Sequence, residues 1–412
     1  MLVVRPSVKL AHLISIAFVV ILAGLSACGS QSTSGQSTIT IGVSLPNSGD
    51  NVSDGKLLEQ GYDLWADVVN KNGGLLGRQV VLDKLHDNGT PEQVKTNYLN
   101  LIATRHDDLV LGSLSSPLIT AEATAAKQYD YALIEGIGST NKLFANHFPN
   151  LFAVSLPIKD YLTSFADYIL SLPANDANRP KSVAYIQADS PFAAQQIAAA
   201  KTRLGSSLKT YDEGVYGLEN PNYATLAQKI VNDHPDVVIL GTGSDEDCVD
   251  FIKAFKQQHF NPKAIIAASG PDQGKTFSDA IGLNATEGVF VPNGGWYPQI
   301  KTNGNSDFTS AYVAKYGGTV DDIASSTVQG YAAGQVLQQA IQKCNCVDNK
   351  KLVQTLHSST FDTIQGPVKF DEDGQNTVSS AFLFQWQNGH LVAVYPSNQA
   401  QANPEYPRPA RW

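Results

Sequence analysis

The stretch with the most distinctive chemistry spans residues 268–276 and reads ASGPDQGKT. Its end, Gly274-Lys275-Thr276, resembles the close of a phosphate-binding loop, where a lysine and a hydroxyl group contact phosphates and magnesium. The complete motif needs a glycine five residues before Gly274, but Ser269 stands at that position. The motif therefore fails at its first required residue. The same stretch contains Asp272, whose carboxylate could instead hold a cation or remain a solvated loop acid.

Two further loops combine small residues with hydroxyl groups. Residues 112–117 (GSLSSP) place hydroxyls and free backbone N–H groups before an expected helix, which forms a site for one carboxylate or phosphate. Plain capping of the helix by Ser116 is the alternative. Residues 138–141 (GSTN) form a second loop of this kind, or an ordinary turn. A zwitterionic ligand needs such donors at one end and a carboxylate at the other.

Motifs of enzymes are poorly represented. The chain has no His-Glu-x-x-His and no Gly-x-Ser-x-Gly pattern. Residues 206–209 (SSLK) match Ser-x-x-Lys without the companion motifs of that enzyme class, and residues 371–374 (DEDG) do not keep the pattern of a calcium loop. We therefore expect no catalytic residue, no metal site and no cofactor.

The polar loops require strands and helices to hold them, and hydrophobic periodicity predicts an alternating series. Expected strands are residues 38–45, 80–85, 108–111, 131–135, 182–187, 236–240, 264–267 and 289–291, with helices between them. Residues 90–93 (TPEQ) predict a helix that begins with a capping box, and a hairpin at residues 382–395 turns at Asn388-Gly389. Such alternation is typical of parallel sheets with helices on both faces. The predicted fold class is therefore α/β with two doubly wound parallel-sheet lobes, and their ligands bind at the carboxyl ends of the strands.

The N-terminus indicates export. Basic residues precede an apolar run at residues 13–23, and the sequence Leu-Ser-Ala-Cys then ends at Cys28. This pattern resembles a bacterial lipoprotein signal, in which the cysteine is lipidated; an ordinary cleaved signal with an incidental cysteine is the alternative. We expect residues 1–27 to be a lipoprotein signal peptide and the polar residues 28–37 to be a flexible tether. Because no other stretch is long and apolar enough to span a bilayer, the lipid is the expected contact with the cell membrane, in the periplasm or on the outer face.

The net charge and the cysteine content argue against a nucleic-acid-binding protein and against a zinc cluster. The formal net charge is −9 over 412 residues, which argues against nucleic acid as a partner. Cys344 and Cys346 are separated by one residue and Cys248 stands alone, so we expect free or locally paired thiols. No histidine is close enough in sequence to suggest a zinc cluster.

Several short motifs occur in a fixed order along residues 38–395. They are residues 72–77 (NGGLLG), Asp87 with Pro91, residues 112–116, 139–141, 270–272 (GPD), 330–333 (GYAA, expected to open a helix), 366–368 (GPV) and 370–374. Together they resemble the branched-chain amino-acid (Leu/Ile/Val-type) substrate-binding proteins of ABC transporters. The resemblance implies the type I periplasmic-binding fold, with three hinge crossings between the lobes near residues 153–157, 288–292 and 377–381.

The resemblance assigns roles to the two ends of a bound amino acid. Ser116, four residues after Gly112, matches the serine that binds the α-carboxylate, and Ser115 replaces it if the register shifts by one. Asp272 matches an acidic residue, usually glutamate, that contacts the α-ammonium. Because aspartate is shorter than glutamate by one methylene group, the α-ammonium group of the ligand must take a different position in the site. Residues 270–276 are then an ammonium-binding loop rather than a phosphate loop.

The remaining expected ligand contacts also come from this resemblance. Gly138 matches a backbone contact, Thr140 matches a nearby threonine, and Ser139 lies between them in the same loop. Phe192 stands where the family often has tyrosine in the second lobe, and Ser244 stands near the place of another frequent tyrosine. These two departures concern the part of the site that selects the ligand's side chain.

The resemblance finally implies a domain plan and a role. Residues 38–156 plus 290–378 form the first lobe, residues 157–289 plus 379–400 the second, and residues 401–412 a C-terminal tail. The protein would capture a small amino acid, of branched-chain type, by closure of the lobes and deliver it to an ABC permease with its ATPase. A short amide, urea or another small solute is an alternative ligand, and a sensory module that presents its ligand to a receptor is an alternative role.

Overall fold

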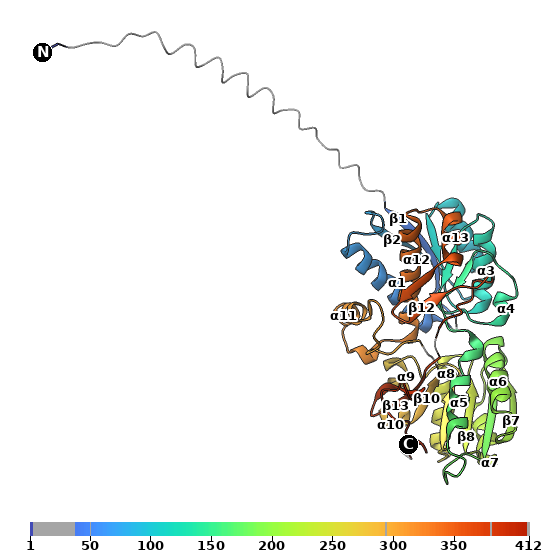
Figure 1. The fold of residues 1–412 in the computed structure, drawn as a ribbon. Coiled ribbons are helices and arrows are strands. Elements are labelled where there is room, and N and C mark those ends of the chain that lie inside the picture. The colour runs from blue at the N-terminus through green and yellow to red at the C-terminus, as the bar shows by residue number, and fades with distance from the viewer. Residues whose placement is uncertain (3–37, 50, 293–294, 380, 410–412) are drawn as a thin grey trace. The chain divides into compact units, whose positions relative to one another are not determined.

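The computed structural model describes residues 1–2, 38–49, 51–292, 295–379 and 381–409. Cys28 and the rest of the predicted signal peptide and tether from residue 3 to residue 37 lie outside this part. Residues 38–409 contain two separate main sheets, and each carries helices on both faces (Figure 1). Within the described residues, no helix has both the length and the apolar character needed to cross a membrane.

The first sheet is parallel throughout and defines lobe 1. Its strands, in spatial order, are β2 (Val80–Asp87), β1 (Ile39–Pro46), β3 (Leu109–Leu111), β4 (Leu133–Glu135) and β5 (Leu151–Ala153). One face packs against α1 (Val52–Lys71), α11 (Asn305–Tyr316), α12 (Ser325–Cys344) and α13 (Asn349–Ser358). The other face packs against α2 (Pro91–Leu99), α3 (Ser116–Lys127) and α4 (Asn141–Phe144). A small antiparallel hairpin, β11 (Thr360–Thr363) with β12 (Gly366–Lys369), adds to the first of these two cores.

Helices α1 and α12 lie unusually close because both carry glycine at their contact. A side chain at Gly61 would meet the carbonyl oxygen of Thr327 at 2.2 Å, and one at Gly334 would meet the ring of Trp65 at 2.3 Å. Helix α12 begins at Ser325, so the GYAA motif at residues 330–333 lies inside the helix and does not open it, contrary to the sequence prediction.

Helix α2 begins with Pro91 in the first turn, as predicted, but without the predicted capping box. The Thr90 side chain makes no capping hydrogen bond and donates instead to Asn88 Oδ1 at 2.7 Å. The competing contact within the preceding turn explains the difference, because threonine readily bonds to its local neighbours.

The second main sheet defines lobe 2 and has an antiparallel edge. Its order is β14 (His390–Tyr395), β13 (Leu383–Gln387), β10 (Val289–Pro292), β9 (Ala264–Ala267), β8 (Val237–Gly241), β6 (Ser182–Ala188) and β7 (Lys209–Tyr216). Strands β10 to β7 are parallel, and the predicted hairpin β13–β14 adds the antiparallel pairs. Its turn residues Asn388 and Gly389 both have positive φ, 53° and 81°, as a type I′ turn requires.

Helices also cover both faces of this sheet. One face packs against α5 (Thr163–Ser171) and α6 (Pro191–Leu204). The opposite face packs against α7 (Tyr223–Asp233), α8 (Asp245–Gln257) and α9 (Lys275–Ile281), followed by the short α10 (Leu283–Thr286). Both lobes are therefore doubly wound, which confirms the predicted fold class.

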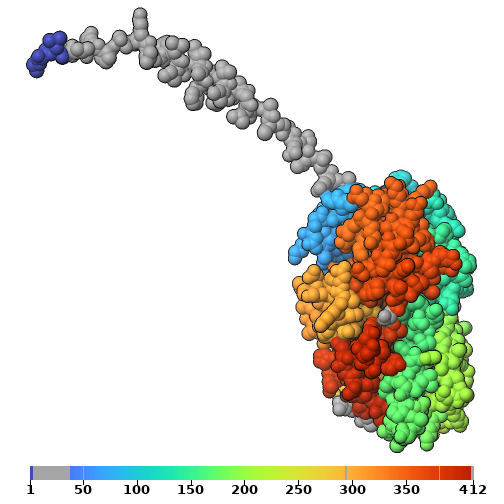
Figure 2. Space-filling view, in the orientation of Figure 1, coloured from blue at the N-terminus to red at the C-terminus, as the bar shows by residue number. Residues whose placement is uncertain are grey.

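The chain passes between the lobes after β5, after β10 and before β13, and these passages correspond to the three expected crossings. The predicted restart of lobe 1 at residue 290 falls inside β10, which pairs with β9 and β13 of lobe 2. We therefore propose that lobe 1 restarts after Pro292. In Figure 2 the orange segment that holds α12 packs with the blue N-terminal segment, whereas the red C-terminal segment packs with lobe 2.

The described part of the C-terminal tail lies against lobe 2. Gln385 Nε2 donates to the carbonyl oxygen of Glu405 at 2.9 Å, and Gln387 Nε2 donates to that of Asn403 at 2.8 Å. Arg408 is only 3% exposed, and its guanidinium donates to the carbonyl oxygen of Ala285 at 3.0 Å. Residues 403–409 are thus a fixed part of lobe 2.

The three cysteines that the structure describes are locally paired or buried, in agreement with the sequence prediction. Cys344, the last residue of α12, forms a disulfide with Cys346. Cys248 is a buried free thiol on α8.

Candidate functional site

A cavity of about 550 Å³ lies where the loops of the two sheets face each other. Helices from both lobes begin at its wall: α1, α3, α4 and α12 from lobe 1, and α6 and α8 from lobe 2. Apart from α12, each of these helices follows a parallel strand, so the topology itself brings their N-terminal ends together. A cavity of this size is within the range of small-molecule sites.

Most of the predicted ligand-binding residues line this cavity. They are Ser115, Ser116, Ser139, Thr140, Phe192, Ser244 and Asp272. Gly138 is not among the lining residues. Its N–H donates to the Glu135 carboxyl group and its carbonyl oxygen accepts from Ser155 Oγ at 2.7 Å, so both of its backbone groups already have partners.

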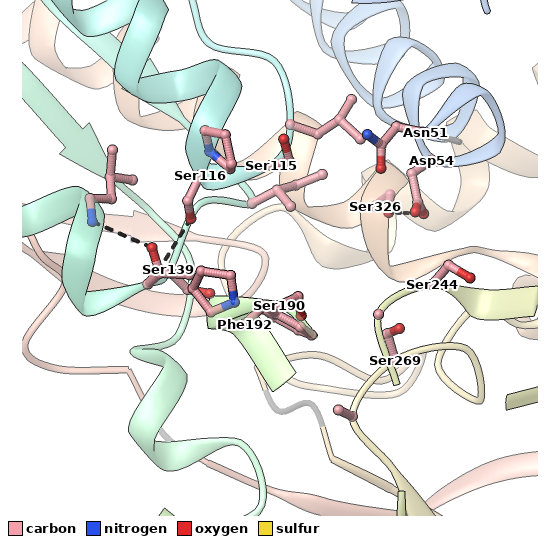
Figure 3. A pocket seen from close by; sticks show the side chains of 18 of the residues that line it. Asn51, Asp54, Ser115, Ser116, Ser139, Ser190, Phe192, Ser244, Ser269 and Ser326 are labelled. Carbon is pink, nitrogen blue, oxygen red and sulfur yellow. Dashed lines mark hydrogen bonds between the residues drawn. The ribbon is translucent and has the colours of Figure 1, made fainter. Parts of the chain in front are cut away.

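The start of α3 forms one side of the cavity. Ser115 is the N-cap residue, has a φ of 65° and makes no side-chain capping bond, so the plain capping by Ser116 that the sequence left open does not occur. Ser116 Oγ accepts from the Thr140 N–H at 3.4 Å, which ties the two serine-rich loops together. A non-glycine residue in this backbone region is strained, and such strain concentrates at functional sites. Figure 3 shows Ser115, Ser116 and Ser139 on this side.

Lobe 2 contributes an aromatic wall and a serine. Phe192, in the first turn of α6, makes an edge contact with Tyr161, their ring centroids being 6.1 Å apart. Tyr161 also lines the cavity and was not predicted, because it lies in the first crossing rather than after a strand. Ser244 is the N-cap of α8 and forms a capping box with Asp247, which fixes its position at the wall.

Two further carboxyl groups line the cavity that sequence reasoning did not identify, Asp54 and Asp245. Asp54, on α1, accepts a hydrogen bond from Ser326 Oγ at 3.1 Å, a contact visible in Figure 3. Burial, and next the negative charge of Asp272, raise the pKa of Asp54 to about 6. Burial, followed by the charges of Asp54 and Asp272, also raises the pKa of Asp245 well above its ordinary value. The three carboxyl groups therefore act on one another across the cavity.

The sequence contains a partial indication that Asp54 and Asp245 contact a ligand. Both lie in the first turn of a helix that follows a parallel strand, which is where ligands of such sheets bind. Acidic residues are also common in first helical turns because they complement the helix dipole, so their type alone did not point to a ligand. Ser326 follows no strand directly, so no sequence pattern pointed to it.

The phosphate-loop reading of residues 268–276 is excluded. Lys275 is exposed and its Nζ donates to Asp279 Oδ1 at 2.8 Å, one turn further along α9. It does not line the cavity, whereas Asp272 does.

The model of the periplasmic binding protein family matches residues 38–390. The chain belongs to the periplasmic binding protein family. This periplasmic binding protein is therefore a solute-binding protein of an extracytoplasmic family and not an enzyme, as the sequence predicted. The resemblance to branched-chain amino-acid binding proteins is confirmed as well.

Known relatives cover nearly the whole chain. Leu/Ile/Val-binding protein homolog 7 of Brucella melitensis biotype 1 is 23% identical across 94% of this chain and 97% of its own length. The crystal structure of the branched-chain amino acid binding protein LivJ from Streptococcus pneumoniae with isoleucine has a TM-score of 0.75 at 16% identity, covering 86% of this periplasmic binding protein and 97% of LivJ. A solute-binding protein from R. palustris in complex with benzoate has a TM-score of 0.71 at 18% identity, covering 86% and 95% of the two chains. These likenesses confirm the type I fold, and their different ligands do not identify the ligand of this chain.

Proposed function

We propose that this periplasmic binding protein captures a small α-amino acid in the cavity between its lobes and delivers it to an ABC importer. The observation that carries the proposal is the placement of hydroxyl groups and a helix start on one side of a single cavity that also contains carboxylates. The names of the relatives favour a branched-chain side chain.

The side formed by α3 suits the carboxylate of such a ligand. The first N–H groups of a helix carry a partial positive charge, and no side chain caps those of α3. Ser115, Ser116 and Ser139 add hydroxyl groups at the same side. Hydrogen bonds from these groups to a carboxylate are charge-assisted and therefore strong.

Asp272 suits the α-ammonium group. It lies in the loop that follows β9, at the wall of the cavity, and its negative charge reaches the other acids there. A carboxylate at the wall of a ligand cavity can form a strong, charge-assisted hydrogen bond with an ammonium group.

The proposed mechanism combines ligand capture by the site residues, attachment to the membrane and delivery to partner proteins. Closure of the lobes buries the ligand, and the closed protein then docks on a permease with its ATPase. Lipid attached at Cys28 holds the protein at the membrane. A short amide, urea or another small solute is the alternative ligand, and presentation of the ligand to a sensory receptor is the alternative role.

A thermal-shift screen against amino acids and small amides tests the proposal. A ligand present at about 100 times its Kd stabilises the folded state by about 2.7 kcal/mol. Calorimetry with the best ligand then compares Asp272→Asn with Lys275→Ala. A hydrogen bond to a charged partner is worth about 1.5–3 kcal/mol, so Asp272→Asn should weaken binding roughly tenfold to a hundredfold.

Lys275→Ala is the control, because this exposed lysine is paired with Asp279 outside the cavity. It should bind as the parent does. Equal affinities for Asp272→Asn and the parent would remove Asp272 from the site and favour an uncharged amide.

A further inference from the structure

The cavity contains more carboxyl groups than an amino acid with an uncharged side chain can pair with. Asp54 belongs to lobe 1, whereas Asp245 and Asp272 belong to lobe 2. Among the described lining residues, Lys142 is the basic one. A single ammonium group accounts for one of the three carboxylates, so two remain without a role.

The protein itself does not neutralise these two acids. Asp245 Oδ2 is buried and has no hydrogen-bond partner in the described part of the chain. Asp54 accepts from Ser326, which is uncharged. Neither forms an ion pair with any residue that the structure describes. A buried carboxylate without a partner is costly, and groups kept at such a cost commonly serve a ligand.

A metal ion does not explain the arrangement. Within residues 38–409, apart from the few positions not described, no group of three or more histidine, cysteine, aspartate or glutamate side chains is close enough to hold one. The carboxylates instead stand around the wall, from α1 on one lobe to α8 and the β9–α9 loop on the other. Charges distributed in this way fit an organic cation whose amine groups are separated.

Anionic ligands fit less well than cationic ones. A benzoate-like ligand would bring a further negative charge to a cavity with three carboxylates. The apolar lining, which includes Leu114, Ile137 and Phe192, is compatible with the methylene groups of an aliphatic chain.

We propose that the ligand is a basic α-amino acid, whose side-chain cation lies against Asp54 and Asp245 while its α-ammonium group pairs with Asp272. This inference rests on the proposed function: it keeps the α-amino acid as ligand and replaces the branched-chain side chain, which the names of the relatives favour, by a basic one. The cation bridges the lobes, because Asp54 and Asp245 lie on opposite sides of the cleft, and it thereby favours the closed form.

Calorimetry near pH 8 with lysine, ornithine, arginine, leucine, isoleucine, the diamine putrescine and benzoate tests the proposal. We expect the best basic amino acid to bind at least tenfold more tightly than leucine or isoleucine. Asp245→Asn should remove most of this preference, and circular dichroism with thermal unfolding verifies that the variant folds. Asp250→Asn is the matched control, because it changes a partly exposed aspartate on the same helix that pairs with Lys253.

Each outcome bears on a distinct claim. Tighter binding of leucine than of every cation overturns the basic side chain and leaves the amino-acid function standing. Tighter binding of putrescine than of lysine supports the cationic cavity but overturns the amino-acid proposal, because the diamine has no carboxylate. Tightest binding of benzoate, or binding of none of these compounds, overturns both. An equal preference in Asp245→Asn and Asp250→Asn overturns the role of Asp245.

The pH dependence provides a second readout. Asp54 faces Asp272, Asp245 and Glu246 of lobe 2 and Ser326 of α12, and its pKa is raised to about 6. Protonation of Asp54 below that pH removes the charge that the side-chain cation requires. The affinity for lysine should fall severalfold from pH 8 to pH 5, whereas that for leucine should change little. Equal pH dependence for both ligands would contradict the pairing with Asp54.

Discussion

Replacing Asp54 by asparagine should stabilise the ligand-free protein. The pKa of this carboxyl group is raised from the ordinary value of 3.8 to about 6, first by burial and second by the charge of Asp272. Each pH unit of such a difference is worth 1.36 kcal/mol, so the ionised carboxylate costs the empty folded state at most about 3 kcal/mol. Asparagine keeps the shape and can still accept from Ser326, but its amide N–H groups also need partners. We therefore expect a net gain of about 1–2 kcal/mol near pH 8.

The gain in stability from Asp54→Asn should become smaller as the pH falls. A carboxyl group whose pKa is higher in the folded state takes up protons on folding between the two pKa values, so it destabilises the folded protein as the pH rises through that range. The penalty is complete above about pH 6 and disappears below the unfolded pKa of 3.8. The advantage of Asp54→Asn should accordingly shrink to less than half between about pH 8 and about pH 4.5.

Urea denaturation of the ligand-free protein at both pH values measures this effect. Asp67→Asn is the matched control, because Asp67 is an exposed residue of the same helix that pairs with Lys315 at 2.7 Å. Exposed pairs of this kind contribute about 0–1 kcal/mol, so the control should be slightly destabilised at most. Destabilisation by Asp54→Asn at pH 8, or a gain that does not depend on pH, would refute the reasoning.

Two other predictions concern the lipid anchor at Cys28 and the closure of the two lobes on the ligand. Cys28→Ala should leave the protein unlipidated and move it from the membrane fraction to the soluble fraction, and unchanged labelling with a lipid precursor would contradict this. Saturating ligand should reduce the radius of gyration measured by solution scattering, because the lobes close on the cavity; identical curves with and without ligand would argue against closure.

The interior strands could be read from the sequence because they are buried on both faces. Every residue of β8 and β9 is buried, so each appears as a continuous apolar run bounded by polar loops. β7 (KTYDEGVY) was not predicted, because it is an edge strand whose residues are largely exposed and polar. β5, three residues long, was not predicted either.

Sequence reasoning identified part of the cavity wall but missed two of its three aspartates. The strand-end rule and the family resemblance placed Ser116 and Asp272 at one cavity, as the structure has them. They could not reveal Asp54 and Asp245, because a first-turn aspartate looks the same in sequence whether it faces solvent or a ligand. Gly138 does not line the cavity, and its small size serves packing: a Cβ there would lie 2.5 Å from Ile119 Cδ1.

Lobe 1 is completed by one of the last helices to be synthesised. α1 ends at Lys71 and α12 begins at Ser325, and all the parallel strands of lobe 2 lie between them in sequence. The ribosome therefore releases α1 long before the helix whose backbone fits against Gly61. Contacts so distant in sequence form slowly, because a long loop must close first. For a protein of an extracytoplasmic family, this order of synthesis postpones completion of the first core until most of the chain has been made.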